Sequence, residues 1–285
     1  MFKRTPQSRN VGLLLAANRI VLAASGNPPI FAARSVAGSQ EWASAVSELL
    51  GDHGLAKSTV RVVLDATLYQ QIQIDKPAVP ETEMAGALPW AIKDYVSEPV
   101  LQLAMDYVDL PTPPAGRPRI NVICLPKQQV QLLADAVNGV AQLATVSSDE
   151  LAMTALYPAD NMVRMLLWQE QGQDLQLLVF YQGGLCFSRQ LRGFAALVGE
   201  AAPDSTLLDA LALEIQRSLD YLAGQLKLPE LGQMQVAIAS AFTGTLISHM
   251  EQTFGFGVSV MTNKAVTAGV EYLSAYAAAI GGEAR

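Results

Sequence analysis

The stretch VGLLLAANRIVLAAS, Val11 to Ser25, follows a basic start and decides how the chain begins to fold. A secretory signal peptide needs an unbroken apolar run of about 7 to 15 residues, whereas Asn18 and Arg19 interrupt this one. Arginine is unfavourable in a translocated helix, while Asn-Arg suits a reversal between two strands. With a third apolar segment at Pro29 to Val36, the pattern predicts an antiparallel meander, not a signal peptide or a membrane anchor.

The composition allows a large core and argues against several functions. The 285 residues are 51% hydrophobic and 16% charged, which is enough chain for two domains. No apolar window approaches the roughly 18 uncharged residues of a membrane helix. The net charge is −7, and no basic cluster interleaved with aromatics follows the start, which argues against nucleic-acid binding. Cys124 and Cys186 stand alone in predicted strands and are interpreted as reduced core thiols of a cytoplasmic protein.

The first half continues with helices and strands around a compact insertion. A helix is predicted at Ser39 to Gly54 with Ser39 as its N-cap. A small α/β unit is predicted at about 70–140, and its helix, Val79 to Ser97, should kink or restart near Pro89 because proline removes a backbone donor.

The second half repeats this plan. Three consecutive strands are predicted between Met162 and Leu191, with turns at Gly172 and at Gly183-Gly184. The helix Asp204 to Leu226 follows, and the tail is predicted to be a helix of small residues. The chain therefore looks duplicated in architecture although not residue by residue. We assign 1–157 to a first lobe with the insertion, 158–264 to a second lobe, and 265–285 to a C-terminal helix that packs back on the first lobe.

Two α/β halves, each opened by a three-stranded meander, form the plan of the superfamily of actin, the heat-shock chaperone ATPases and the sugar kinases. The segment QIQIDKPAVPETEMAGALPWAIKDYVSEPVLQLAMDY, Gln71 to Tyr107, resembles the matching part of PilM-type pilus assembly proteins. EIQRSLDYL, Glu214 to Leu222, and FSRQL, Phe187 to Leu191, are similar to two further stretches of that family. Within it the alanine-rich sequence looks most like the MshI-type members of mannose-sensitive haemagglutinin (MSHA) pili, and it is also similar to the cytoplasmic domain of GspL.

The resemblance implies an α/β, actin-like (ribonuclease H-like) fold of two lobes with a small inserted subdomain. It also implies a scaffold of an MSHA-type pilus assembly platform, cytoplasmic and peripheral to the inner membrane. The implied partners are a PilN-like or MshJ-like single-span membrane protein, whose short tail docks beside the insertion, and other pilus components. Trp90, Tyr95 and Tyr107 are candidates for lining that peptide groove, although core packing explains them equally well.

The residues that bind Mg-ATP in this superfamily are missing. Nucleotide-hydrolysing members carry Asp-x-Gly in the first turn, and alignment by Gly12 puts Leu14 and Ala16 at those positions. The second turn reads Trp168-Gln169-Glu170, with its carboxylate displaced. The loop from Ile238 to Gly244, which should be rich in glycine, keeps only Gly244. We therefore expect no ATP hydrolysis, no metal site and no required cofactor.

Glu214, Arg217 and Ser218 share one helix face where superfamily members touch adenosine, which leaves weak ATP binding open. The alternative is an ion pair and a hydroxyl bonded back to its own helix. His53 and His249 lack metal-ligand spacing, and Asp149-Glu150 has the pattern of a helix N-terminus. The rival functions are an active actin-like ATPase or small-molecule kinase, and a self-associating filament protein.

Overall fold

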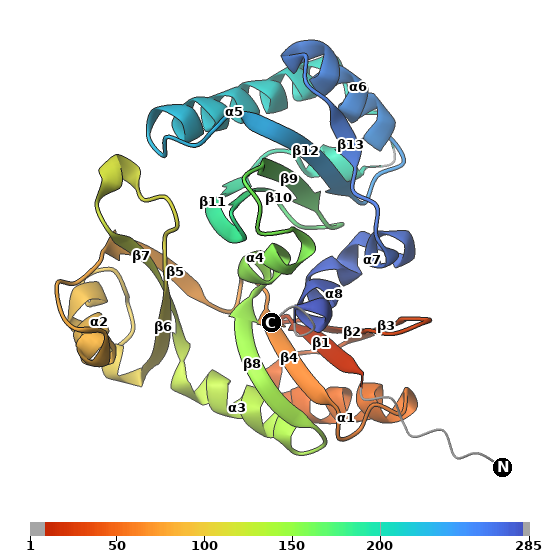
Figure 1. Ribbon diagram of the computed structural model, residues 1–285. Helices are drawn as coiled ribbons and strands as arrows, with labels where there is room; N and C mark the ends of the chain where they lie inside the picture. The colour runs from red at the N-terminus through yellow and green to blue at the C-terminus, as the bar shows by residue number, and fades with distance from the viewer. Residues whose placement is uncertain (1–8, 200, 282–285) are drawn as a thin grey trace. The chain divides into compact units, whose positions relative to one another are not determined.

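The computed structural model describes residues 9–199 and 201–281 of the chain (Figure 1). These residues form two compact units. The first unit comprises the described parts of Met1–Leu110, Arg117–Ala155 and Ser274–Arg285, and the second comprises Pro111–Gly116 and the described parts of Leu156–Leu273.

The predicted opening meander is confirmed. Strands β1 (Asn10–Leu15), β2 (Arg19–Ala24) and β3 (Ile30–Ser35) pair antiparallel in sequence. The Ala16 amide donates to the Arg19 carbonyl at 3.0 Å and closes the first reversal. Asn18 and Arg19 thus stand at the turn, where a polar pair has access to solvent.

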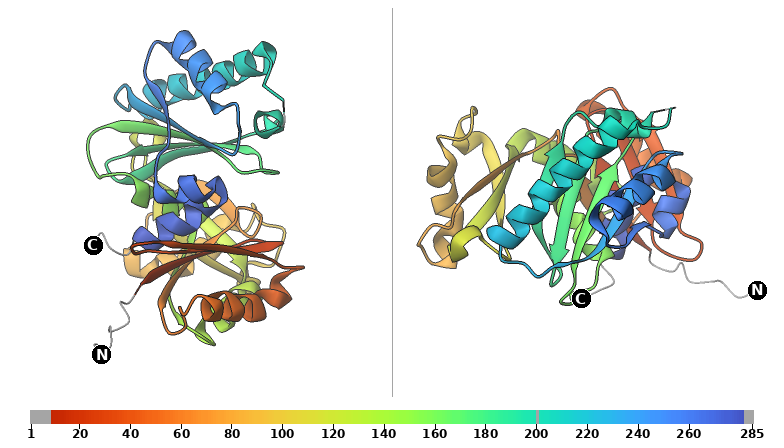
Figure 2. Two further views of the ribbon diagram at one scale, coloured as in Figure 1. Left: turned by 90° about the vertical axis from the view of Figure 1, so that its right-hand side faces the viewer. Right: turned by 90° about the horizontal axis from the view of Figure 1, so that it is seen from above.

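The first unit is built on a five-stranded sheet of order β3-β2-β1-β4-β8. Strand β4 (Thr59–Leu64) runs parallel to β1, and β8 (Gln142–Ser148) runs parallel to β4. Helices α1 (Trp42–Asp52) and α3 (Lys127–Asn138) pack together and share the buried core on one face. Helix α8 (Leu273–Ile280) lies on the other face, against β1 at Gly12 (Figure 2).

The insertion between β4 and α3 forms its own small sheet, of order β5-β7-β6. Its strands are β5 (Gln70–Asp75), β6 (Leu103–Asp109) and β7 (Arg119–Pro126), and helix α2 (Met84–Ile92) covers one face. Pro89 lies inside α2, which ends three residues later. The small sheet and α2 lie within 70–126, while the buried residues of α3 belong to the core of the first sheet.

The second unit repeats the same sheet with the order β11-β10-β9-β12-β13. The strands β9 (Val163–Gln169), β10 (Leu175–Tyr181) and β11 (Gly184–Leu191) form the predicted second meander. Strand β12 (Leu231–Ile238) is parallel to β9, and β13 (Val258–Val260) is parallel to β12. Helices α5 (Ser205–Gly224) and α6 (Thr243–Phe254) share one core with this sheet.

Matching strand orders and directions in the two sheets confirm the predicted duplicated, actin-like α/β fold. The element order also matches, because α5 and α6 follow the second meander as α1 and α3 follow the first. The remaining helices are α4 (Asp149–Ala152) and α7 (Lys264–Ala268). Short 3₁₀ turns occur at Ser39–Glu41, Glu81–Glu83, Val100–Gln102, Pro114–Gly116, Met153–Leu156, Ala195–Val198 and Val270–Tyr272.

Two local predictions are wrong. Ser39 does not cap α1, because a 3₁₀ turn intervenes and Glu41 precedes the helix; the Glu41 carboxylate instead accepts the Ala37 amide at 2.8 Å. The tail is not one helix, because Gly269 adopts φ 155° between α7 and the turn that leads into α8. Other caps are confirmed: the Asp204 carboxylate accepts the Leu207 amide at the start of α5, and Ser148 accepts the Leu151 amide at α4.

Candidate functional site

An apolar groove lies beside the inserted sheet, within the first unit. Its volume is about 290 Å³. Four elements supply most of its lining: residues 104–108 of β6, Ile123 and Leu125 of β7, Val130 and Leu133 of α3, and residues 146–148 of β8. Leu64, the last residue of β4, and Leu151 of α4 complete it.

Strand alternation separates this groove from the core under α2. Ile120, Val122 and Cys124 of β7 point toward α2 and are buried with it. Because successive side chains point to opposite faces, Ile123 and Leu125 project to the other side of the small sheet, into the groove. The groove and α2 therefore lie on opposite faces of the small sheet.

Two strand edges border the groove. Strand β6 ends the small sheet, and β8 ends the larger sheet of the first unit, in the part of the chain that the structure describes. Ala144, Thr145 and Val146 of β8 are all exposed, although side chains of a half-buried strand normally alternate. A register shift at Ala144 interrupts the pairing of β8 with β4. A strand edge of this kind offers backbone donors and acceptors to an added strand.

The floor of the groove is buried and its rim is exposed. Leu133 is 1% exposed and Leu125 is 9% exposed, and both also belong to the core of the first sheet. By contrast, Val146 is 43% exposed. An exposed apolar side chain beside a buried apolar floor is the arrangement that accepts an apolar anchor from a partner.

A buried acidic residue lies next to the groove, where α4 begins. Asp149 accepts hydrogen bonds at Oδ1 from the Tyr69 hydroxyl at 3.1 Å and from the Glu150 amide at 2.8 Å. Burial, with the nearby Glu150 and Asp65 carboxylates, raises the pKa of Asp149 to about 8. Burial and the Asp149 charge also raise the pKa of Tyr69. The bond to Tyr69 joins the start of α4 to the segment between β4 and β5, and Asp149 stands at the helix start predicted from the sequence.

The structure places the three aromatic side chains predicted to line a groove on the α2 side of the small sheet. Tyr107 belongs to the stretch of β6 that borders the groove, but its side chain packs on the core under α2, as do Leu103 and Met105. Its hydroxyl donates to the Glu81 carboxylate, and the Lys76 ammonium lies 5.5 Å from its ring centroid. The bond to Glu81 raises the pKa of Tyr107. Trp90 and Tyr95 do not line the groove; they are 74% and 60% exposed on and just after α2, on the opposite face of the small sheet. Sequence reasoning missed Ile123 and Val146, whose exposure depends on sheet position.

The position of the metal-ordering carboxylate in the first turn is filled by a core side chain. Leu14 is 1% exposed, and Ala16 is buried with its carbonyl accepting from the Trp42 indole at 3.3 Å. The turn is thus closed by apolar packing and by a hydrogen bond to α1. Neither side chain offers an oxygen to a hydrated cation.

The second turn is bound to its own surroundings. The Gln169 side-chain amide donates to the Gln173 carbonyl at 3.0 Å and to the Phe194 carbonyl at 3.2 Å. Glu170 is buried, at 4% exposure, and its carbonyl accepts the Gln173 amide. Gln169 therefore joins this turn to the segment after β11, a tertiary role that its place in the motif did not reveal.

Glu214, Arg217 and Ser218 lie together on α5 as predicted from their spacing. The Glu214 carboxylate pairs with Arg217 and with Arg189 of β11, both at 2.5 Å. The Ser218 hydroxyl donates to the Glu214 carbonyl at 2.9 Å and is 1% exposed. All three polar side chains thus have partners within the protein.

The Arg189–Glu214 pair has a counterpart in the first unit. Arg34 of β3 pairs with Glu48 of α1 and lies 3.2 Å from Asp52. Both β3 and β11 are the third strand of a meander and the edge of a sheet, and α1 and α5 are corresponding helices. The duplication therefore extends to one ion pair that fastens each edge strand to its helix, which comparison of the two half-sequences missed.

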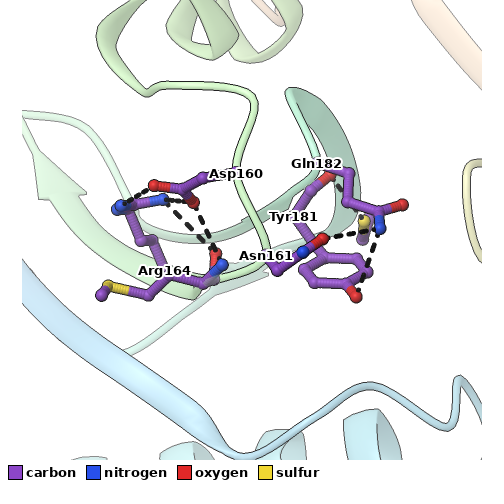
Figure 3. Close-up of polar contacts among 7 residues, drawn as sticks. Asp160, Asn161, Arg164, Tyr181 and Gln182 are labelled. Carbon is purple, nitrogen blue, oxygen red and sulfur yellow. Dashed lines mark hydrogen bonds and ion pairs between the residues drawn. The ribbon is translucent and has the colours of Figure 1, made fainter.

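The start of the second unit is held by a compact polar cluster (Figure 3). Arg164 of β9 donates to both oxygens of Asp160, at 2.6 and 2.7 Å. These bonds lower the pKa of Asp160 to about 2. Gln182 donates its side-chain amide to Asn161 at 3.0 Å and its backbone amide to the Asp160 carbonyl at 3.1 Å. The cluster joins the predicted linker to the turn between β10 and β11.

Among residues 9–199 and 201–281, no three His, Cys, Asp or Glu side chains gather in a way that could hold a metal ion. His249 instead lies 3.0 Å from Asp209, across α5 and α6, and His53 follows the end of α1. Cys124 and Cys186 are both buried thiols, and burial raises the pKa of each. No helix in the same described ranges is long and apolar enough to cross a membrane.

These features define a protein of the actin-like ATPase fold, with a groove on its inserted sheet and core residues at the expected magnesium positions. A chain of the PilM-PilN type IV pilus biogenesis complex shares the fold with a TM-score of 0.70 at 19% identity, covering 97% of this chain and 99% of that one. The cytoplasmic domain of EpsL, an inner-membrane component of the type II secretion system of Vibrio cholerae, gives 0.52 at 12% identity, with 94% of each chain covered.

A third solved structure is a Bacteroides thetaiotaomicron protein of actin-like ATPase fold and unknown function. It gives a TM-score of 0.53 at 9% identity, covering 92% of this chain and 95% of that one. No family model and no curated protein matches the sequence. At these identities the similarity establishes the fold.

Proposed function

We propose that this chain is a non-catalytic scaffold of a type IV pilus assembly platform, and that its groove binds the cytoplasmic tail of a PilN-like inner-membrane protein. The observation that carries the proposal is the apolar groove of about 290 Å³ between the edges of β6 and β8. The fold shared with a chain of the PilM-PilN complex supports it. So does the family resemblance of Gln71 to Tyr107, the segment that contains α2 and most of β6.

The finer form of the proposal is an MSHA-type platform, with an MshJ-like partner and an MshI-like role for this chain. The alanine-rich sequence supports this choice, because it looks most like the MshI-type members. In this role the protein is cytoplasmic and reaches the inner membrane through its partner. The proposal also includes other pilus components and further copies of this chain as partners of the protein.

The groove suits an extended tail. A disordered segment can add to a strand edge through backbone hydrogen bonds and place every second side chain on the apolar floor. The tail loses its conformational freedom only when it binds, which keeps the affinity moderate and the interaction reversible. Val146 at the rim and Leu125 and Leu133 at the floor supply the apolar contact for such side chains.

Replacing Val146 with aspartate is expected to weaken binding of a synthetic partner tail, measured by isothermal titration calorimetry with the full chain. A charge at this rim must be desolvated when the tail binds, so we expect a loss of about 2 kcal/mol, or roughly thirtyfold in Kd. Val260→Asp is the matched control, because Val260 is 44% exposed, also on an edge strand, and lies in the second unit. If Val146→Asp and Val260→Asp bound the tail with equal affinity, the tail would bind elsewhere on the protein. If titration of the tail into the unaltered protein released no heat, the proposal would be wrong.

The same titration distinguishes strand addition from side-chain docking. N-methylation of a tail residue removes one backbone donor without changing its side chain. If the tail adds to β6 or β8, methylation of alternate residues should abolish binding while the intervening positions tolerate it. Uniform tolerance along the tail would rule out backbone pairing and leave only the side-chain contacts.

The proposal includes the absence of ATP hydrolysis. Leu14 and Ala16 are buried in the first turn, and Gln169 bonds to the carbonyls around the second. We expect phosphate release from Mg-ATP to equal the protein-free rate. Turnover that disappears in Glu170→Gln would contradict this expectation and favour the active ATPase or kinase.

A further inference from the structure

Helix α2 has an uncovered apolar face that the groove does not use. All nine residues of α2, MAGALPWAI, lack a polar side chain, and Met84, Leu88 and Ile92 are buried against the small sheet. A helix that is apolar all round is normally covered on every side. Here Trp90 is 74% exposed on the outward side, and the space around Gly86, one turn earlier, is open.

The apolar surface extends beyond the helix. The 3₁₀ turn Val100–Gln102 contacts α2 and carries Leu101, which is 78% exposed. Tyr95 is 60% exposed, but its backbone is held, because its amide donates to the Ile92 carbonyl at 2.9 Å and its carbonyl accepts from the Gln70 side chain at 3.0 Å. We name Trp90, Tyr95 and Leu101 the α2 patch. Its members are large, exposed and attached to ordered backbone, which is the composition of a protein interface.

The charges beside the patch define the partner. Glu83 directly precedes α2 and Asp94 follows its last residue by two, so Trp90 lies between two carboxylates along the chain. Both carboxylates are exposed, as are Glu98 and Lys93, and the Lys127 ammonium donates to the Leu101 carbonyl at 2.9 Å. The three carboxylates outnumber these two ammonium groups, and this excess of negative charge beside the indole attracts a cation.

We propose that the α2 patch is a second docking surface, and that it binds an amphipathic helix whose apolar face is flanked by lysine and arginine. This site goes beyond the proposed function, because α2 and the groove lie on opposite faces of the small sheet. A second copy of the chain is disfavoured as the occupant, because antiparallel pairing of two α2 helices sets Glu83 against Asp94 at both ends. An anionic lipid surface is disfavoured by the same carboxylates.

The test uses the fluorescence of the full-length protein. Of its three tryptophans, Trp42 and Trp168 are buried at 1% and 5% exposure, so Trp90 reports the patch. The probe is the amidated peptide LKKLLKLLKKLLKL, with LEELLELLEELLEL as its acidic counterpart. We expect the lysine peptide to shift the emission to the blue and to protect Trp90 from acrylamide in a saturable manner, weakened by 0.5 M salt. The glutamate peptide should do neither.

Charge-reversed variants separate the site from general attraction to an acidic protein. Glu83→Lys with Asp94→Lys should weaken binding of the lysine peptide at least tenfold. Glu230→Lys with Asp135→Lys makes the same change in net charge at two exposed positions outside the patch, and should leave the affinity within twofold. Equal loss in the two double variants would overturn the proposal, as would no protection of Trp90 by the lysine peptide.

Two further outcomes would assign the patch to another occupant and overturn the proposal. One is protection of Trp90 by phosphatidylglycerol vesicles at a lipid concentration where phosphatidylcholine vesicles have no effect. The other is sedimentation equilibrium that shows a dimer which Trp90→Ala dissociates. Val146→Asp should leave binding of the lysine peptide unchanged, so failure of the groove and failure of the α2 patch are observed separately.

Discussion

Replacing Gly12 with alanine is expected to destabilise the first unit by about 3 kcal/mol or more. A Cβ at this position would lie 1.9 Å from the Ala275 carbonyl oxygen and 2.9 Å from the Ala279 amide nitrogen. Both contacts are to the backbone of α8, so no side-chain rotation relieves them. The change either displaces α8 or distorts β1 in the centre of its sheet.

Urea denaturation of the unaltered protein and of Gly12→Ala measures this loss of stability, through the midpoint of the unfolding transition and its slope. Gly51→Ala is the matched control, because Gly51 lies in α1 and an added Cβ there meets nothing within 4 Å. Alanine in a helix should stabilise by about 0.5–1 kcal/mol relative to glycine. A Gly12→Ala protein as stable as the unaltered one would show that α8 does not approach β1 as described.

Replacing Asp149 with asparagine is expected to stabilise the protein at pH 8 by more than about 2 kcal/mol and to have little effect at pH 4. Burial raises the pKa of this carboxyl to about 8, from an ordinary value of 3.8. The folded state therefore favours the protonated form, whereas the unfolded chain ionises near pH 4. This contribution to stability is complete below pH 4 and is lost as the pH rises toward 8, by at most about 1.4 kcal/mol per unit.

The asparagine retains the contacts that matter. Its side-chain oxygen can accept from the Tyr69 hydroxyl and the Glu150 amide, as the Asp149 carboxyl does at 3.1 and 2.8 Å. The free energy of unfolding should be measured from pH 4 to pH 8 for both proteins. Asp94→Asn, at an exposed position, is the control and should follow the unaltered protein throughout. If Asp149→Asn also followed it, burial of this carboxyl would not govern the pH dependence.

The groove illustrates what sequence reasoning could and could not find. The resemblance of Gln71 to Tyr107 indicated the region, because β6 borders the groove, but the Tyr107 side chain packs on the α2 side of the small sheet. Val146 gave no signal, because it stands 39 residues after Tyr107 in the mixed polar and apolar strand QLATVSS. Its exposure follows from β8 being the last strand of its sheet. Trp90 and Tyr95 were grouped with Tyr107, and all three lie on the α2 side of the small sheet, opposite the groove.

Local deviations have similar causes. Ser39 has a good capping side chain, but the chain enters α1 through a 3₁₀ turn, and Glu41 satisfies the nearby amide instead. Gly269 was absorbed into a helical pattern of small residues, whereas its φ of 155° lets the chain turn before α8. In both places the direction of the chain toward distant elements decided between conformations of similar local energy.

By itself the sequence determined the two meanders, most of the helices, the duplicated actin-like α/β plan and the apolar residues at the expected magnesium positions. These features depend on the period of apolar residues and on turn residues, which act over a few neighbours. Only the tertiary structure decided which strands lie at sheet edges, which face of the insertion is open, and that Asp149 is buried. Those properties depend on contacts between residues far apart in the chain, and no local pattern records them.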